Sequence, residues 1–261
     1  MPLTIRTSLS SLCLLLLLGC AALPPGKRHP RDPWERTNRA TYRFNDAFDR
    51  AVVKPLARGY VRVAPQFVRT GVTNFFDNLE YPIVIVNDLL QGEFRPFLSD
   101  TGRLLLNTTI GVGGLMDPAT AAGIDKNDRD FGQTLGKWGV KSGPYLVLPV
   151  LGPRDVRDAV GEIPDTYANP RTYTKFWVDA GLWTIRGIDR RSRLLYADSA
   201  LMSAYDPYAF VRNVYLQHRD FKVNGGQSQS EEEQERKLLE EAGEDHPEPE
   251  GSAPPVQPPP R

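Results

Sequence analysis

The chain has 261 residues and a mass of 29.2 kDa, with 40% hydrophobic and 25% charged residues, so it is neither fibrous nor disordered throughout. Its formal net charge of zero is a balance between regions, because residues 225–261 hold ten acidic and three basic residues. The rest of the chain therefore carries an excess of seven positive charges. A moderately positive body suits an anionic surface better than a nucleic-acid groove, and we expect no nucleic-acid partner.

The N-terminus has the pattern of a secretion signal. An apolar run from Leu9 to Leu18 is too short to span a bilayer core of about 30 Å. It ends in Leu17-Leu18-Gly19-Cys20, which resembles a bacterial lipobox. This predicts a lipoprotein signal peptide over residues 1–19 and lipidation of Cys20. Ala21, not aspartate, follows the cysteine, which favours the outer membrane over the inner one.

Residues 20–31 are rich in proline and basic residues, and we expect them to form a lipidated tether. Several acyl chains, each burying methylene groups at about 0.8 kcal/mol apiece, would anchor the protein without a spanning helix. No later apolar run is long enough for a conventional spanning helix. The alternative is an ordinary secretory signal that ends near Ala21 or Ala22.

Four helices are expected in the first part of the mature chain. Asp32-Pro33-Trp34-Glu35 is typical of a helix start, with aspartate as the N-cap, and this helix is expected to reach Lys54-Pro55. A second helix is expected from Pro65 to the residue before Pro82, because proline inside a helix removes a backbone hydrogen bond. The third and fourth are expected at about 82–91 and 96–106.

Large apolar residues recur with helical spacing along the first two of these helices. They are Trp34, Tyr42, Phe44, Phe48, Val52, Phe67, Val68, Val72, Phe75, Phe76 and Leu79. Such stripes are most often hydrophobic core, but aromatic residues mixed with arginine also mark a membrane interface. The pattern alone leaves both interpretations open.

The later part of the domain, which we place at residues 32–224, is also expected to be mostly α-helical. Asp117-Pro118 and Asp206-Pro207 repeat the capped-proline start, and Thr172 to Met202 fits one long amphipathic helix. Residues 225–261 are rich in glutamate and proline, cannot bury a core, and are expected to form a disordered tail.

Glycine occurs every few residues between Gly111 and Gly152, where the backbone must turn tightly or lie against something. Neither a dinucleotide fingerprint nor a P-loop is present, so we expect no nucleotide cofactor. Two interpretations remain for this region: a tight structural loop or a mobile hairpin.

The inventory of reactive residues is poor. The only cysteines, Cys13 and Cys20, lie in the N-terminal apolar segment, and His218 is the only histidine in the expected domain. No G-x-S-x-G motif frames a serine nucleophile, and there are too few histidines for a histidine-rich metal site. We therefore expect no enzyme, no metal and no cofactor.

Two pairs of acidic residues could be imagined as acid/base dyads: Asp128 with Asp130, and Asp155 with Asp158. Arginines lie beside each pair in the sequence, namely Arg129, Arg154 and Arg157. Ion pairing on a solvated surface is therefore the favoured interpretation.

A series of short motifs carries a family resemblance. In chain order they are Asn38-Arg39, Tyr42-x-Phe44-Asn45, Lys54-Pro55, Asn74-Phe75-Phe76-x-Asn78-Leu79, Leu90-Gln91-Gly92, Arg103, Asn107-Thr108-Thr109-Ile110-Gly111-x-Gly113-Gly114, Asp130-Phe131-Gly132-x-Thr134-Leu135-Gly136, Gly143-Pro144-Tyr145-x-x-Leu148-Pro149, Gly152-Pro153 and Arg157-Asp158. Over about Asp32 to Asn224 the sequence resembles the MlaA (VacJ) family of outer-membrane lipoproteins. Leu104 stands where an aromatic residue is common, and the tail lies outside the family core.

The resemblance implies a ring-shaped bundle of amphipathic helices with a glycine-rich hairpin, lying in the inner leaflet of the outer membrane and lipid-anchored on the periplasmic side. It implies removal of mislocalised phospholipids from the outer leaflet through an amphipathic channel, which maintains lipid asymmetry. The implied partners are phospholipids, the bilayer, a trimeric porin and a soluble periplasmic lipid carrier of the MlaC type.

The resemblance also suggests a hairpin beside the channel, formed by residues 131–145. Four glycines divide this stretch into pieces that are not expected to form a stable helix: Gly132, Gly136, Gly139 and Gly143. Trp138 and Tyr145 suit an apolar–polar boundary, while Lys137 and Lys141 suit lipid phosphates. We expect this segment to be a gate or channel wall.

Two other function classes stay open. One is a structural lipoprotein that tethers porin or envelope components. The other is a lipid-cleaving enzyme, which would have to rely on His218.

Overall fold

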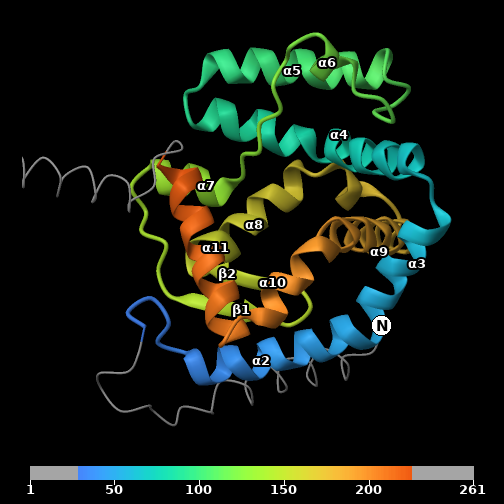
Figure 1. Ribbon diagram of the computed structural model, residues 1–261. Coiled ribbons are helices and arrows are strands. Elements are labelled where there is room, and N and C mark those ends of the chain that lie inside the picture. The colour runs from blue at the N-terminus through green and yellow to red at the C-terminus, as the bar shows by residue number, and fades with distance from the viewer. Residues whose placement is uncertain (1–28, 225–261) are drawn as a thin grey trace, which may run out of the picture.

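The computed structural model describes residues 29–224. The predicted signal peptide, Cys20 and the tail at 225–261 lie outside the described residues, and so do the expectations made for them. Most of the described residues are helical, and the helices at 35–109, 131–137 and 207–223 lie around the outline of a ring, with the helix at 156–168 inside it (Figure 1). This confirms the prediction of a mostly α-helical, ring-shaped fold.

One side of the ring is a continuous helical run (Figure 1). α2 (Glu35–Phe48) passes directly into a π-helical turn, η1 (Asp49–Val53), and then into α3 (Lys54–Val63). The predicted end at Lys54-Pro55 is therefore wrong. The wide π-helical turn comes just before Pro55, whose ring would clash with the carbonyl four residues earlier in a regular α-helix.

The predicted N-cap at Asp32 is also wrong. α2 begins at Glu35, and no side chain caps it. Asp32 is fully buried, and its carboxylate accepts hydrogen bonds from Asn38 Nδ2 (2.8 Å), from Arg212 Nη1 (3.1 Å) and from the hydroxyl of Tyr208. The carboxylate thus holds the start of α2 against α11 (Pro207–Val223).

α4 (Gln66–Leu90) and α5 (Phe94–Thr109) form the opposite edge of the ring (Figure 1). The predicted break at Pro82 is wrong, because α4 runs through it. A proline inside a helix costs about 3 kcal/mol, and packing on either side offsets this cost. Tyr81 and Val84 are buried, and the Tyr81 hydroxyl donates to Asp100 of α5 at 2.9 Å.

The two predicted capped starts at Asp117 and Asp206 are confirmed. The Asp117 carboxylate accepts from the backbone N–H of Thr120 and caps α6 (Pro118–Ala121). The Asp206 carboxylate accepts from the N–H of Ala209 and caps α11.

The single long helix expected from Thr172 to Met202 is wrong. The chain forms η2 (Pro170–Tyr173), α9 (Phe176–Arg193), η3 (Leu195–Ala197) and α10 (Asp198–Ser203). Arg191 near the end of α9 donates to Asp198 at the start of α10 (2.8 Å) and to Asp49 of η1. These ion pairs draw the chain back on itself after α9.

The glycine-rich region contains one helix and one hairpin. α7 (Phe131–Lys137) is followed by the antiparallel strands β1 (Tyr145–Leu148) and β2 (Gly152–Asp155), in which Tyr145 faces Asp155. α8 (Val156–Ala168) starts directly after β2 and packs against α7.

Two asparagines of α2 hold β1 in place. Asn38 donates to the carbonyl of Tyr145 (3.0 Å) and accepts from the amide of Val147 (2.9 Å). Two turns later Asn45 accepts from the amide of Val150 at the hairpin tip (2.8 Å). A carboxamide supplies both a donor and an acceptor, so these side chains satisfy backbone groups of the hairpin.

The interior is largely polar and many large apolar side chains point outward. Buried polar and charged residues outnumber buried apolar ones, and the apolar cluster centres on Tyr145, Val147, Tyr208 and Leu216. Of the aromatic stripes Phe76 is buried, but several members are exposed, namely Trp34, Phe44, Phe48, Val52, Phe67 and Val68. The stripes thus turn mostly outward, as a membrane-interface surface requires. None of the described helices is both long and apolar enough to cross a bilayer.

Close contact between α7 and α8 depends on two glycines. A Cβ atom on Gly161 would lie 2.6 Å from the backbone nitrogen of Gly132, and one on Gly132 would lie 2.5 Å from Asp158 Oδ1. Only glycine leaves room for this approach.

We expect Gly161→Ala to lower the free energy of unfolding by roughly 1–3 kcal/mol, because the helices must separate to admit the methyl group. Gly181→Ala on α9 is the control, because a Cβ there meets nothing within 4 Å. Helix propensity should make the control neutral or slightly stabilising. Equal urea midpoints for the two variants would contradict the packing role of Gly161.

Candidate functional site

A cavity of about 890 Å³ lies inside the ring. Its walls come from α4, residues 126–130, the hairpin, α8, η2, α9 and α11. Eight basic and seven acidic side chains line it, so the wall is highly charged but close to neutral.

Arg186 of α9 is the centre of one ion-pair cluster in this wall. Its guanidinium donates to Asp77 (2.7 Å) and Glu80 (2.8 Å) of α4, and its side chain is 7% exposed. Arg190, one turn later, donates to the same Glu80 at 2.8 Å, and Lys126 pairs with Asp77. Burial opposes ionisation of Asp77, but its two cationic partners outweigh burial and lower its pKa.

Arg219 of α11 is the centre of a second cluster. Its two terminal nitrogens donate to Asp130 at 2.6 and 2.9 Å, and one of them also donates to Asp158 of α8 at 2.6 Å. Asp130 caps α7, so this arginine joins three helices. Burial opposes ionisation of Asp130, but the hydrogen bonds from Arg219 outweigh it and lower the pKa to about 2.

An apolar strip runs beside these charges. Its members come from α4, the hairpin tip and α9, and they are Ile83, Val84, Val150, Leu151 and Trp183. The cavity therefore offers fixed dipoles and ion pairs next to apolar surface. Such a lining can accompany an amphipathic molecule, whose polar group would otherwise be stranded without partners.

The expectation of solvated surface ion pairs is only partly right for the acidic residues. Asp130 does form an ion pair, but with Arg219 of α11 rather than with the adjacent Arg129, and Asp128 pairs with Lys222. Asp155 and Asp158 both pair with the neighbouring Arg157 at 3.7 Å, as expected, but all three side chains are buried rather than solvated. Their location follows from the close contact of α7 and α8, which sequence spacing does not reveal.

His218 lines the cavity from α11 and is exposed. Burial of part of its ring and the nearby Lys222 lower its pKa. Within residues 29–224 no hydrogen bond joins this histidine to a serine.

The expectation that the glycines exclude a helix is wrong at Gly132 and Gly136, which lie in α7. A Cβ on Gly136 would lie 2.7 Å from Val223 of α11, so both glycines serve close packing. Gly139 and Gly143 follow the helix and have φ of +89° and +70°, which side chains rarely adopt. Packing by the neighbouring helices outweighs the low helix propensity of glycine here.

The other residues of the predicted gate lie in three different environments. Lys137 forms an exposed ion pair with Glu93, and Lys141 is exposed. Tyr145 is fully buried in the apolar cluster rather than at a polar boundary. None of the seven predicted channel residues lines the 890 Å³ cavity.

Three of the cavity charges that the sequence interpretation missed lie on α9. Arg186, Arg190 and Arg193 follow each other at intervals of four and three residues, which places them on one helix face. This spacing predicts, from the sequence alone, a row of arginines on one face of the helix. The acidic partners of Arg186 and Arg190 on α4 lie about one hundred residues earlier, so the spacing in the sequence does not reveal them.

The whole described domain corresponds to a known family: the sequence model of the MlaA lipoprotein matches residues 30–222. The chain belongs to the MlaA lipoprotein family. It is 37% identical over 232 residues to the intermembrane phospholipid transport system lipoprotein MlaA of Escherichia coli (strain K12), covering 87% of this chain and 92% of that protein. It is 34% identical over 236 residues to the protein of the same name from Haemophilus influenzae, covering 85% and 91%.

A solved structure supports the family assignment. It is described as "Structural basis for maintenance of bacterial outer membrane lipid asymmetry", and superposes with a TM-score of 0.67 at 38% identity. The match covers 74% of this chain and 98% of the solved chain. The ring of helices is therefore the MlaA fold.

The buried carboxyl groups near the cavity give the protein a pH dependence. Burial raises the pKa of Asp165 to about 6, although Asn87 and the amide of Phe131 donate to it. Because ionisation costs more in the folded state, stability should fall as the pH rises from about 4 to about 6. We expect Asp165→Asn to reduce this slope in urea titrations at pH 4, 5 and 6.

Asp155 and Asp88, whose pKa values burial also raises, to about 6 and about 7, should account for the slope that remains. Asp130 acts in the opposite direction, because its stabilisation is lost as the pH falls from about 4 toward 2. An unchanged slope between pH 4 and 6 in the Asn variant would show that Asp165 ionises normally.

Proposed function

We propose that this member of the MlaA family removes mislocalised phospholipids from the outer leaflet of the outer membrane and passes them to a periplasmic carrier, thereby maintaining lipid asymmetry. The observation that carries the proposal is the charged and partly apolar cavity of a domain that exposes many large apolar side chains. Two relatives are named for intermembrane phospholipid transport, and the solved structure is described for lipid asymmetry. Both support a function in phospholipid transport.

A phospholipid that crosses a leaflet needs hydrogen-bond partners for its headgroup and apolar contact for its tails. The Arg186 and Arg219 clusters supply donors and acceptors, and Trp183 lies among the apolar residues of the same cavity. The phosphate of a zwitterionic headgroup can replace a carboxylate as the partner of an arginine, while its ammonium group pairs with that carboxylate. No charge is then left without a partner. Movement down a gradient of mislocalised lipid requires no nucleotide and no covalent chemistry.

Attachment to the membrane has two components in this proposal. Cys20 carries the lipid anchor on the periplasmic side of the outer membrane, as the lipobox pattern indicates. The exposed apolar side chains of the ring then enter the inner leaflet, including Val63, Phe67 and Leu98 at 82%, 77% and 69% exposure. Burying such side chains contributes about 25 cal/mol per Å² of apolar area, so the domain itself would hold the membrane.

The partners we propose are a trimeric porin beside the ring and a soluble carrier of the MlaC type that receives the lipid. The exposed apolar side chains offer a surface for the porin, and the charged wall of the cavity suits transfer of a polar headgroup to a soluble protein. The segment from Phe131 to Tyr145 stays a proposed gate in its second half, where Gly139 and Gly143 hold positive φ angles.

The proposal is tested by blocking the cavity without disturbing the fold. Gly187 lines the cavity, and a Cβ there meets nothing within 4 Å, so Gly187→Trp fills open space. Gly181→Trp is the matched control, because Gly181 lies on the same helix, has the same free space and does not line the cavity.

Cells that carry only the Gly187 variant should accumulate outer-leaflet phospholipid to the level of cells that lack the gene. The readout is labelling of surface amine groups with a reagent that does not cross the membrane. The control should retain normal asymmetry at equal abundance. Normal asymmetry in both variants would favour a tethering protein, and phospholipid cleavage that depends on His218 would favour an enzyme.

A further inference from the structure

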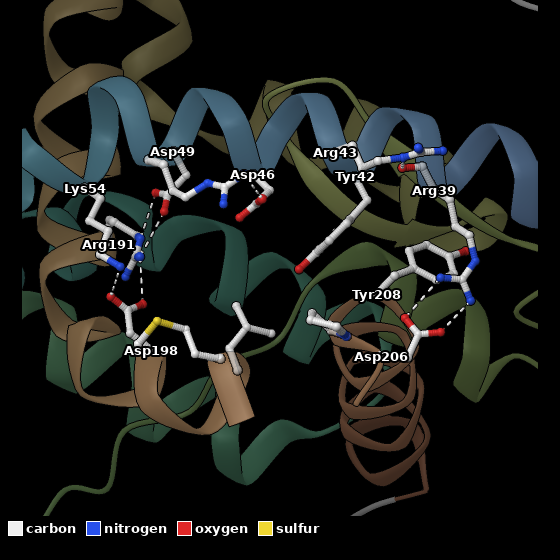
Figure 2. A pocket seen from close by; sticks show the side chains of 14 residues that line it. Arg39, Tyr42, Arg43, Asp46, Asp49, Lys54, Arg191, Asp198, Asp206 and Tyr208 are labelled. Atoms are coloured by element: carbon white, nitrogen blue, oxygen red, sulfur yellow. Dashed lines mark hydrogen bonds and ion pairs between the residues drawn. The ribbon is translucent and has the colours of Figure 1, made fainter. Parts of the chain in front are cut away.

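A second pocket, of about 590 Å³, lies between α2 with η1 on one side and α10 with the start of α11 on the other (Figure 2). It shares no lining residue with the larger cavity. α9 separates the two, because Arg190 lines the larger cavity and Arg191 lines this one.

Ion-pair clusters close both ends of the pocket (Figure 2). At one end Arg191 donates to Asp49 (2.8 Å) and Asp198 (2.8 Å), and Lys54 also pairs with Asp198 (2.8 Å). At the other end Arg39 forms a bidentate ion pair with Asp206. The charges at the Arg191 end are thus engaged with each other.

Arg39 donates to both carboxylate oxygens of Asp206, at 3.0 and 2.6 Å, and also to Glu35. Its guanidinium lies over the Tyr208 ring, 4.4 Å from the centroid. The charge of Arg39 is therefore also paired with carboxylates of the protein.

Arg43 is different from the other basic residues of the pocket. Five basic and four acidic side chains line it, and Glu35, which pairs with Arg39, adds a fifth carboxylate beside the lining. Arg50 pairs with Asp46 at 2.7 Å, whereas Arg43 has no carboxylate partner among residues 29–224. Its Nε donates to the carbonyl of Arg39 at 3.3 Å, and its two terminal nitrogens are left to donate to a ligand.

Tyr42 adds a second donor. Figure 2 shows its hydroxyl pointing into the space between α2 and α10, and no described residue accepts a hydrogen bond from it. Burial and the nearby Asp46 raise the pKa of this phenol, so it keeps its proton. Leu201 and Met202 of α10 add apolar side chains to the lining of the same pocket.

We propose that this pocket binds the phosphodiester group of a glycerophospholipid, with Arg43 as its cation and Tyr42 as a hydroxyl donor. A phosphodiester carries one negative charge, which would balance the charge of Arg43, because no carboxylate among residues 29–224 pairs with this arginine. A guanidinium presents paired donors that fit phosphate oxygens, and Leu201 and Met202 would contact the glycerol and first methylene groups. The choice of a lipid as the source of the phosphate rests on the proposed function.

The test uses the full-length protein in non-ionic detergent, with Gly187→Trp present throughout so that the larger cavity is filled. Dihexanoyl phosphatidylglycerol, below the concentration at which it forms micelles, is titrated calorimetrically. Arg43→Gln should weaken binding about tenfold, the loss expected for one hydrogen bond to a charged group. Arg43→Lys should give an intermediate affinity, because it keeps the charge and loses the paired donors.

Arg36→Gln is the matched control, because Arg36 is exposed on the same helix, outside the pocket. It should bind like the parent. Equal affinity for the parent and Arg43→Gln would overturn the proposal, and so would equal losses in the Arg36 and Arg43 variants. Competition by inorganic phosphate at the same concentration as the lipid would overturn the lipid assignment.

A failure of the proposed function gives a different result. It would leave outer-leaflet phospholipid normal in cells that carry Gly187→Trp. The calorimetric comparison of the Arg36 and Arg43 variants does not depend on that outcome.

Discussion

A buried charge must find a partner, and this constraint governs the structure. Much of the apolar surface points outward, so the interior consists largely of polar groups that water would otherwise solvate. Arg219 illustrates the solution: one guanidinium from α11 satisfies Asp130 at the start of α7 and Asp158 on α8. Removing one member of such a set would leave the others buried and unpaired, which costs several kcal/mol.

The same constraint links the fold to the proposed transport. Gly132 and Gly161 bring α7 and α8 close enough for the Arg219 cluster, and Asn38 fixes the hairpin against α2. The resulting cavity has charged walls that the fold already holds in place. A headgroup entering it meets oriented partners rather than groups that must first reorganise, and α9 presents arginines to this cavity and to the smaller pocket alike.

Local signals in the sequence predicted the helical class, the capped starts at Asp117 and Asp206, and the family. Pro82 was misinterpreted because its cost is local, whereas the burial of Tyr81 that offsets it comes from α5. The cavity could not be predicted for a related reason. Arg219 and Asp130 are 89 residues apart in the sequence, and only the packing of three helices brings them together.

The most direct test of the account is to ask whether phospholipid enters the larger cavity in living cells. A photo-crosslinking amino acid can replace Trp183, which lines that cavity, or Trp177, which is 81% exposed on the same helix and does not line it. After irradiation the purified protein is analysed by mass spectrometry for attached phospholipid. The account predicts an adduct at position 183. Adducts at position 177 alone would mean that lipid touches only the outer surface, and would contradict passage through the ring.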